Sequence, residues 1–189
     1  PGGAAICGAM LWYPDETIQH AGIVTGLGGY AGHSHKYKKK GGSGYLFRTS
    51  TVQDFSGVTG ACLLVKTAVY DEMHGLDEQF AVAFNDVDFC LRVRDAGYRI
   101  AWTPYAELIH YESKSRGWDE KDPVKAARFA AEQQRLYTIH GKENILDDPY
   151  YNPNLTRDRE DFSESDDLRR LKAVSYTHLR AHETSQDIV

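Results

Sequence analysis

Two carboxylates, Asp86 and Asp88, stand at the start of a predicted helix. A carboxylate within hydrogen-bond reach of a hydroxyl can remove its proton as a general base. The same residue types also have a structural use, because Asn85 or Asp86 can accept hydrogen bonds from the free amides of a first helical turn. Asp88 is spaced to form an ion pair with Arg92 one turn later. By themselves, these residues favour the capping interpretation of Asp86.

The helix that would position Asp86 is predicted from the spacing of apolar residues. Val87, Cys90 and Leu91 recur at i, i+3 and i+4, which is typical of a helix with one buried face. Gly97 is expected to end this helix, because glycine enters the left-handed conformation at little cost. Residues 98–102 then alternate like a strand. The predicted unit is therefore loop, helix, turn and strand.

Three segments carry a resemblance to a known family. They read Gly75-Leu76-Asp77-Glu78, then Phe84-Asn85-Asp86-Val87-Asp88-Phe89-Cys90-Leu91-Arg92, and then Ala96-Gly97-Tyr98-Arg99. Together they resemble the C-terminal half of the catalytic domain of family-2 inverting glycosyltransferases. The resemblance implies an α/β protein with a partial GT-A fold, a mixed sheet with flanking helices, and Asp86 as the general base. That family usually has glutamate at the position of Asn85.

Further binding residues follow from the same resemblance. The segment Thr59-Gly60-Ala61 is similar to one that lines the cleft floor near the donor sugar and the acceptor. Small side chains there would let a ligand approach the backbone closely. Asn85 and Asp88 are counted with these three residues as substrate-binding candidates. The alternative for residues 59–61 is tight packing of a strand against a helix.

A metal site is also implied by the resemblance. His110 follows an apolar strand pattern, and histidine at this position in GT-A enzymes coordinates the divalent metal or touches the donor diphosphate. The expected cofactor is Mg²⁺ or Mn²⁺, which would neutralise the departing diphosphate, and Arg116 is expected to bind the donor phosphates. A partly buried histidine bonded to the backbone is the alternative. The family's Asp-x-Asp metal motif is expected before Pro1.

Residues 25–45 are rich in glycine and lysine and are predicted to form a flexible surface loop, because no helix follows that would complete a phosphate-binding loop. The segment contains four lysines, Lys36, Lys38, Lys39 and Lys40. They could contact anionic lipid headgroups or an acceptor pyrophosphate, although most charge runs are only solvated. His33 and His35 would share one face of an extended chain. A metal-dependent hydrolase using both, with Asp86 and His110, is a more distant hypothesis.

Other segments are predicted to be structural. They comprise strands at 4–13 and 17–24, a buried strand within 56–65, a short helix at 66–73, an alanine-rich helix capped by Asp122 and a turn-rich tail at 147–162. The aromatic and amide side chains of the tail suit sugar stacking, but a strap over the fold is the commoner role. His20 is assigned no catalytic role.

The composition is ordinary for a soluble globular protein, with 41% hydrophobic and 26% charged residues. A formal charge of −5 and a pI near 5.9 argue against nucleic-acid binding. No apolar run approaches the roughly 20 residues of a membrane span. The three cysteines lack CxxC spacing and are expected to be buried, reduced thiols. A cytoplasmic location is therefore expected, with peripheral contact at the inner membrane face left open.

Residues 1–163 are predicted to be the acceptor-side half of a glycosyltransferase domain without its nucleotide-binding half. Residues 164–173 are predicted to be a tail, and residues 174–189 resemble a translated sequencing adapter. The expected reaction transfers a sugar, with inversion, from a nucleotide-diphosphate donor to a hydroxyl of a glycan or lipid-linked glycan, in bacterial surface polysaccharide synthesis. The fragment alone is expected to be inactive. The alternative is a non-catalytic carbohydrate-binding or scaffolding module.

Overall fold

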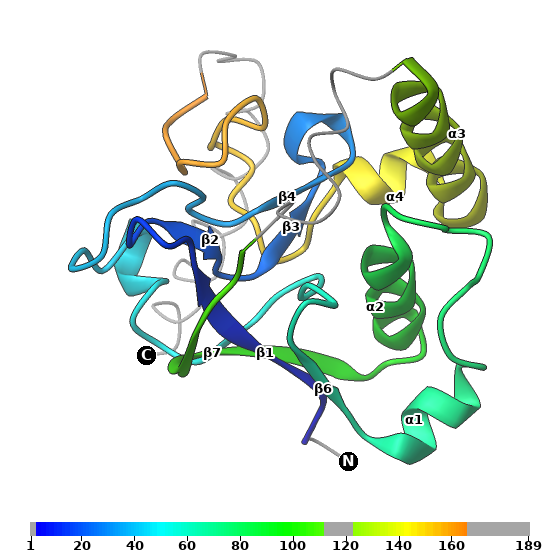
Figure 1. Cartoon of the computed structure of the whole chain (residues 1–189), viewed down its shortest axis with the longest axis horizontal. Helices are drawn as coiled ribbons and strands as arrows, with labels where there is room; N and C mark the ends of the chain where they lie inside the picture. Colours follow the sequence, from blue (N-terminus) through cyan, green and yellow to red (C-terminus); the bar gives the residue numbers. More distant parts are fainter. Residues whose placement is uncertain (1–2, 112–122, 166–189) are drawn as a thin grey trace, which may run out of the picture.

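The computed structural model describes residues 3–111 and 123–165 (Figure 1). The main sheet contains β1 (Ala4–Trp12), β2 (Ile18–His20), β5 (Gln53–Asp54), β6 (Leu63–Val65) and β7 (Arg99–Ile109), while β3 (Ile23–Thr25) and β4 (Ala31–His33) form a separate pair. The helices are α1 (Thr67–Glu72), α2 (Asn85–Asp95), α3 (Pro123–His140) and α4 (Lys142–Leu146), with short 3-10 turns η1 (Leu27–Gly29) and η2 (Tyr45–Phe47). This mixed α/β architecture, a curled sheet flanked by helices, confirms the predicted fold class and is compatible with a partial nucleotide-sugar transferase fold.

Strand β1 is the centre of the main sheet. It pairs in parallel with β7, and antiparallel with β6 near its start and with β2 at its end. Its apolar sequence fits this place, because both faces of a central strand are covered. The strand predicted at 17–24 is divided into β2 and β3, since Gly22 turns between them with φ 98°. A side chain there would collide with the ring of Phe55.

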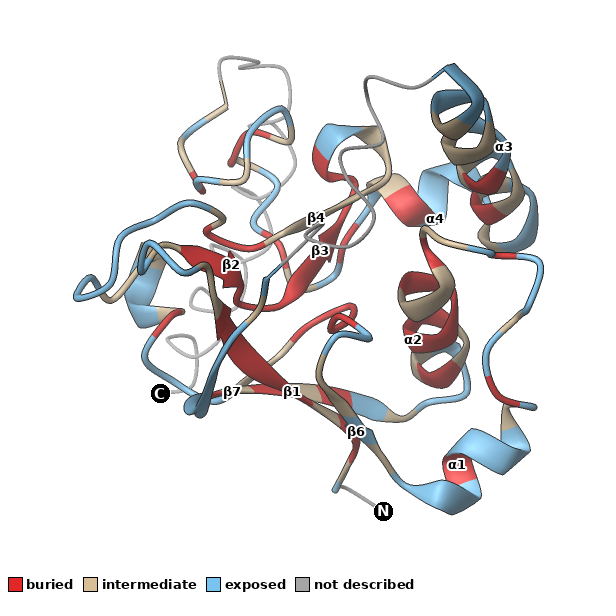
Figure 2. Cartoon of the chain, viewed as in Figure 1, coloured by how far each residue is buried: buried red, intermediate tan, exposed pale blue. Residues whose placement is uncertain are grey.

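Strand β7 is longer than the predicted strand at 98–102. Its register on β1 jumps, so that Ala9 faces Thr103 while Met10 faces Glu107. The extra residues include Pro104, which has no amide hydrogen for the ladder and therefore suits a bulge. Beyond the bulge the strand is exposed (Figure 2).

The strand predicted to be buried within 56–65 is β6. It pairs only at the start of β1, and Leu64 is 75% exposed. The prediction of burial is therefore wrong for this side chain, because β6 lies at the edge of the sheet. The short helix that was predicted next is confirmed as α1.

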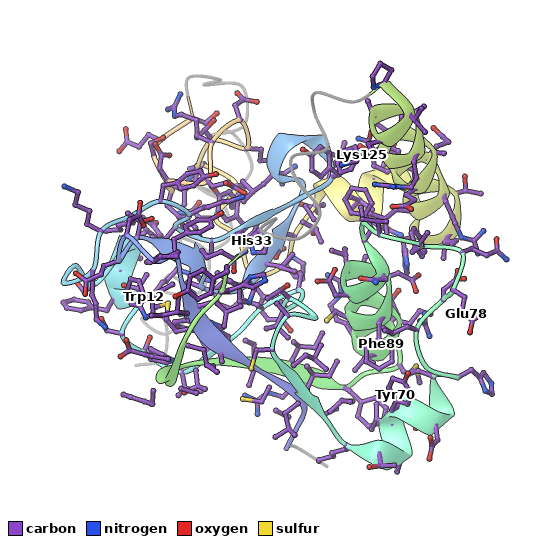
Figure 3. The ribbon with its side chains drawn as sticks, viewed as in Figure 1. Trp12, His33, Tyr70, Glu78, Phe89 and Lys125 are labelled. Carbon is purple, nitrogen blue, oxygen red and sulfur yellow. The ribbon has the colours of Figure 1, made fainter. Side chains whose placement is uncertain are left out.

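Helix α2 packs through the face predicted from its spacing. The three predicted apolar positions are all buried: Val87, Cys90 and Leu91. Phe89 of the same helix lies beside Tyr70 of α1, with ring centroids 5.5 Å apart (Figure 3). Gly97, with φ 86°, follows the end of the helix as predicted. Sequence periodicity thus placed both the helix and its buried face.

Helices α3 and α4 build a second core cluster against α2. Its buried members include Leu91, Leu136 and Ile145. Glu132 of α3 is also buried, and its carboxylate accepts hydrogen bonds from the amides of Val82 and Ala83 at 3.2 and 2.6 Å. Helix α3 is therefore structural, as predicted, and it fixes the loop that enters α2. Asp122, the predicted cap, lies outside the described residues.

Residues 25–45, predicted to be a flexible surface loop, lie partly at the surface, with residues 37–42 exposed, and partly in the fold. They contain η1 and β4, and Ser34 and His35 are buried. His35 adopts φ 57°, which ends the extended path, so it does not share a face with His33. Lys40 forms an ion pair with Glu107 at 2.7 Å. The polar contacts of Ser34 and His35, which a glycine-rich sequence does not reveal, hold this segment in place.

The tail at 147–162 straps over the fold. Tyr151, Leu155 and Phe162 are buried in the main core cluster. Asp148 is also buried, and it accepts hydrogen bonds from the amide and hydroxyl of Thr25 at 2.7 and 3.2 Å. The strap interpretation is therefore confirmed for this segment.

The cysteines only partly match the prediction of buried thiols. All three are free, but Cys7 and Cys62 are half-buried and only Cys90 is buried. Burial raises the pKa of the Cys90 thiol to about 12. Among the described residues, no helix is both long and apolar enough to cross a membrane.

Candidate active site

Asp86 lies at the start of α2, where the helix meets the loop that carries residues 59–61. Phe84, the residue just before α2, has a left-handed backbone with φ 63° and turns the chain into the helix. A large residue rarely adopts this conformation. The buried Phe84 ring packs against Tyr30 and Phe129, with ring centroids 5.5 and 5.0 Å away. Tertiary packing thus sets the direction in which α2 begins.

The carboxylate of Asp86 bridges the helix and the loop. Oδ2 accepts a hydrogen bond from the amide of Gly60 at 2.8 Å, and Oδ1 accepts one from the amide of Val87 at 2.9 Å. A helix cap would instead accept the second or third amide. The side chain of Asn85 accepts only the next amide, at 2.7 Å. The prediction that Asn85 or Asp86 caps α2 is therefore wrong.

Asp86 keeps capacity for a ligand. It is half-buried, and a carboxylate has about four lone-pair positions, of which the two amides occupy two. The remaining positions could accept a hydroxyl proton. Helix α2 and the Gly60 amide fix the direction of the carboxylate, as a general base requires.

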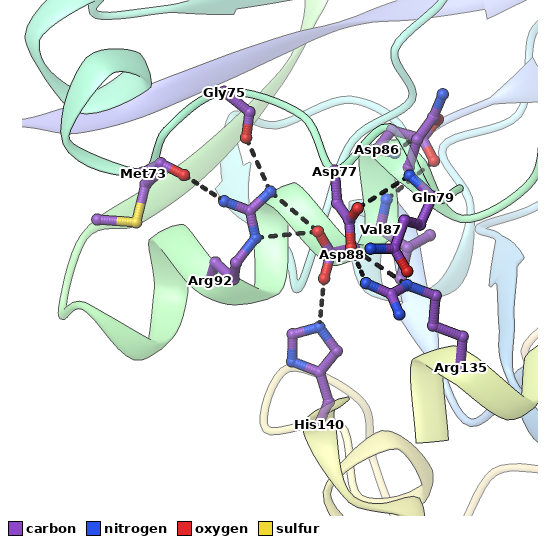
Figure 4. Close-up of polar contacts among 11 residues, drawn as sticks. Met73, Gly75, Asp77, Gln79, Asp86, Val87, Asp88, Arg92, Arg135 and His140 are labelled. Atoms are coloured by element: carbon purple, nitrogen blue, oxygen red, sulfur yellow. Dashed lines mark hydrogen bonds and ion pairs between the residues drawn. The ribbon is translucent and has the colours of Figure 1, made fainter. Parts of the chain in front are cut away.

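Asp88 has a different environment (Figure 4). It is 1% exposed, and its two oxygens lie 2.9 Å from Nε of Arg92 and 2.9 Å from Nε2 of His140. Arg92 also donates to the carbonyls of Met73 and Gly75, at 2.5 and 2.8 Å. The predicted pair with Arg92 is confirmed. The network joins α2 to α3 and to the turn after α1. The predicted substrate contact of Asp88 stays a prediction, and its 1% exposure shows that it is much less accessible than Asp86.

Residues 59–61 divide into a buried and an exposed part. Thr59 is 8% exposed, whereas Gly60 and Ala61 are exposed. A methyl group on Gly60 would stand 3.5 Å from Cβ of Asp86, which is an ordinary contact. Tight packing therefore does not explain the glycine. The structure brings the backbone of Gly60 and the carboxylate of Asp86 together on one accessible surface.

His20 is a buried residue that contacts the loop carrying residues 59–61. It is fully buried, and its Nε2 accepts hydrogen bonds from the amides of Gly22 and Thr59 at 3.3 and 3.4 Å. Its Nδ1 lies 2.8 Å from Nδ1 of His33. Burial, followed by the neighbouring His33 and His110, holds the pKa of His20 well below its ordinary value. A neutral ring can accept these amides, which agrees with a structural rather than catalytic histidine.

The predicted metal and phosphate contacts involve His110 and Arg116, and the described residues do not test them. His110 donates its amide to the carbonyl of Trp12 at 2.9 Å, and its buried Nδ1 has no hydrogen-bond partner among the described residues. In residues 3–111 and 123–165, no three His, Cys, Asp or Glu side chains could hold a metal ion. Arg116 lies outside the described residues. The metal site stays a prediction.

Sequence reasoning missed the residues from α3 that hold α2 and the loop before it. In the sequence, His140 lies 52 positions from its partner Asp88. Glu132 lies 49 positions from Ala83, whose amide donates a hydrogen bond to its carboxylate. Helical spacing reveals the Asp88–Arg92 pair because both residues belong to one helix. No local pattern indicates a partner on another helix.

The chain is similar to several bacterial proteins. It is 48% identical to the uncharacterized protein y4gI of Sinorhizobium fredii over 161 residues, 85% of this chain and 18% of that protein. It is 35% identical to the O-antigen biosynthesis protein RfbC of Myxococcus xanthus over 150 residues, 79% of this chain and 11% of that protein. A shorter match, 32% over 80 residues, is to an N-acetylglucosaminyl-diphospho-decaprenol L-rhamnosyltransferase of Mycobacterium tuberculosis, covering 42% of this chain and 24% of that enzyme.

The chain therefore spans less than a quarter of the length of these three relatives. No family model and no solved structure matches it.

Proposed function

We propose that this chain is part of a glycosyltransferase that builds a bacterial surface polysaccharide. In this proposal the enzyme transfers a sugar, with inversion, from a nucleotide-diphosphate donor to a hydroxyl of a glycan or lipid-linked glycan. The names of two similar proteins, an O-antigen biosynthesis protein and a rhamnosyltransferase, support this class of reaction.

The observation that carries the proposal is the tethered carboxylate of Asp86 beside the exposed backbone of Gly60. An acceptor hydroxyl would donate to an open lone pair of Asp86. Its proton would pass to the carboxylate as its oxygen attacks the anomeric carbon. The nucleoside diphosphate would leave from the opposite face, which inverts that carbon.

The proposed cofactor is Mg²⁺ or Mn²⁺, with His110 as one ligand. Bound metal would neutralise the charge of the departing diphosphate. The described residues do not assemble a three-ligand site, so the other ligands would have to come from outside residues 3–111 and 123–165. Loss of nucleoside diphosphate release on adding EDTA to the full-length protein, and its return with Mn²⁺, would support this part.

The test of Asp86 uses the full-length protein that contains this chain, with Asp86→Asn and the control Asp95→Asn. Asp95 belongs to the same helix but lies at its other end, where it is exposed. Nucleoside diphosphate release is measured with a panel of nucleotide-sugars and lipid-linked acceptors. Asp86→Asn is expected to lower kcat by about 10²–10⁴-fold with little change in the KM for the donor. Unchanged kcat in that variant would remove Asp86 as the base.

The alternative remains a carbohydrate-binding module without catalysis. It is favoured by a groove of aromatic and amide side chains that lies apart from Asp86. A full-length protein that binds glycans but releases no nucleoside diphosphate from any donor would support this alternative over transfer.

A further inference from the structure

A concave surface that does not include Asp86 lies elsewhere on the molecule. It is formed by η2, β5 and residues 149–152, has a volume of about 510 Å³ and is named here the Tyr45 groove. Its lining includes Tyr45, Leu46, Arg48, Gln53, Tyr150 and Asn152. In Figure 1, η2 is the short cyan helix at the left, on the opposite side of the view from α2. Small-ligand sites commonly have volumes of about 300–1,000 Å³.

Aromatic rings form the walls and the base of the groove. Tyr45 and Tyr150 are half-buried, whereas Phe162 beneath Tyr45 is buried. The Phe162 ring lies 5.8 Å from Tyr45 and stacks on His35 at 4.1 Å, with 14° between the ring planes. A partly exposed ring on a fixed base offers a flat apolar surface at little entropic cost. Such a surface fits the C–H face of a sugar ring.

The position of Tyr45 is fixed by the buried His35. Nε2 of His35 accepts the amide of Tyr45 at 3.0 Å, and Nδ1 lies 2.7 Å from the hydroxyl of Ser34. This arrangement requires a neutral imidazole with its proton on Nδ1. One wall of the groove is therefore preorganised, which reduces the cost of binding.

Polar groups stand between the aromatic walls. Asn152 donates to the hydroxyl of Tyr45 at 3.1 Å, and Gln53 donates to the carbonyl of Arg48. These amides can also meet hydroxyls of a ligand, because each carries a second donor or acceptor. Asp54 is paired with Arg99 at 2.9 Å, so the groove carries no uncompensated negative charge from this residue.

Arg48 is held mainly by ring stacking. Its guanidinium lies 4.8 Å from the ring centroid of Phe55 and 5.6 Å from that of Phe162. Its Nε and Nη2 are buried and have no hydrogen-bond partner among the described residues. Unpartnered buried donors are uncommon and call for an acceptor. Because Arg48 lines the groove, a ligand oxygen bound there could supply that acceptor.

The rim of the groove has a strained backbone. Leu46 and Phe47 adopt left-handed conformations with φ 45° and 62°, and their side chains are 76% and 66% exposed. Neither core packing nor glycine explains this geometry. Left-handed non-glycine residues cluster at ligand-binding sites. Leu46 lines the groove, whereas Phe47 does not.

We propose that the Tyr45 groove binds a saccharide segment of the glycan on which the protein acts, at a site separate from Asp86. Partly exposed rings, amide groups and two guanidinium nitrogens without a partner among the described residues match the apolar faces and hydroxyl oxygens of sugar rings. The choice of a saccharide rests on the proposed function, while the site itself rests on the geometry above. A growing glycan held at both places would stay bound between transfers.

The first test measures binding of short bacterial O-antigen oligosaccharides to the full-length protein by titration calorimetry. Tyr150→Ala is expected to weaken binding at least tenfold. Tyr105→Ala is the matched control, since Tyr105 is an exposed tyrosine of β7 outside the groove, and it should bind as the unchanged protein does. Equal weakening in both variants, or no binding by the unchanged protein, would overturn the proposal.

A second pair of variants keeps the test valid if Tyr150→Ala does not fold. Leu46→Gly and Phe47→Gly both place glycine at a left-handed position, so neither should harm folding. Leu46→Gly is expected to weaken oligosaccharide binding several-fold, and Phe47→Gly is expected to leave it unchanged. The same affinity in both variants would contradict the proposal.

The two proposals fail in different ways. If Asp86→Asn abolishes transfer but the groove variants bind normally, the groove proposal is wrong and the proposed function stands. If the groove variants lose binding while the protein transfers no sugar, the saccharide site stands and the proposed function is wrong.

Discussion

Asp86 and Asp88 lie two residues apart on α2, yet they belong to different regions of the molecule. Asp88 is buried and bonded to Arg92 of its own helix and to His140 of α3. Asp86 is half-buried and bonded to two backbone amides. The buried network around Asp88 stabilises the fold, whereas the partly exposed carboxylate of Asp86 can still accept a hydrogen bond from a ligand. Two aspartates that are close in sequence can thus have different roles, one structural and one chemical.

This difference arises from helix geometry. Positions 86 and 88 are separated by about 200° around a helix with 3.6 residues per turn, so they face nearly opposite directions. Asp88 points toward α3 and meets His140, while Asp86 points toward the loop that carries Gly60. The comparison makes quantitative predictions for both regions.

The largest expected effect is the loss of Asp88. Asp88→Ala would leave His140 and Arg92 without their shared anion, although Arg92 would keep two carbonyl acceptors. Removing one partner of a buried ion pair costs about 3–5 kcal/mol. Urea unfolding of the full-length protein or of this chain should show a loss of that order. A loss below about 1 kcal/mol would break the contrast with Asp86.

The next effect concerns pH and the buried His35. Burial, then Lys38 and Arg48, lowers its pKa to about 4, although Asp161 acts in the opposite direction. The unfolded chain takes up this proton near pH 6.5, so between pH 6.5 and about 4 the unfolded state binds more protons. Stability should therefore fall as the pH is lowered through this window, by about 3 kcal/mol from His35.

The variant His35→Gln isolates this contribution. It should lower stability at pH 7, since the acceptor for Tyr45 is altered, but it should flatten the pH dependence between pH 6.5 and 4. An equal slope in both proteins would show that His35 is not the group responsible. His20, which is also buried with a lowered pKa, remains in both proteins and so does not affect the difference.

A smaller change in stability is expected for Asp86→Ala. The two lost hydrogen bonds are to backbone amides at a partly exposed site, where such bonds contribute about 1 kcal/mol. Chemical denaturation of Asp86→Ala beside Asp88→Ala measures the contrast directly. A larger loss for Asp86→Ala than for Asp88→Ala would reverse the division of roles argued above.

The smallest expected change in stability is for Gly60→Ala. The added methyl would make an ordinary contact with Asp86, so the melting midpoint should shift little, in keeping with about 0.5 kcal/mol for surface changes. Because the methyl stands beside the carboxylate, acceptor KM should rise several-fold in the full-length protein. Unchanged acceptor kinetics would place the acceptor away from Gly60.

Local sequence patterns predicted the helices and strands of this fold better than they predicted which side chains are buried. The spacing of Val87, Cys90 and Leu91 predicted α2, and Gly97 predicted its end, because both depend on neighbouring residues. The burial of β6 was predicted wrongly, since a short apolar strand looks the same at an edge as at the centre. The burial of Ser34 and His35 within residues 25–45 was not predicted either, because His35 finds its partners through the fold.

The candidate site was predicted unevenly for the same reason. Asp86 and Gly60 were both singled out, and the structure brings them together. The cap interpretation of Asp86 was wrong because α2 begins earlier, with Phe84 at the cap position. The role of Asp88 was only half visible, through Arg92. His140 could not be found from spacing at all.

The sequence by itself determined the class of the fold, the position and buried face of α2 and the identity of the candidate base. The position and buried face of α2 depend on periodicity within one segment, whereas the fold class and the candidate base were implied by the resemblance of residues 75–99 to a known family. Only the tertiary structure decided which carboxylate is buried, what holds Asp86 in place and where the aromatic side chains form a groove. Each of these depends on contacts between distant segments, and burial in the folded chain gives those contacts their strength.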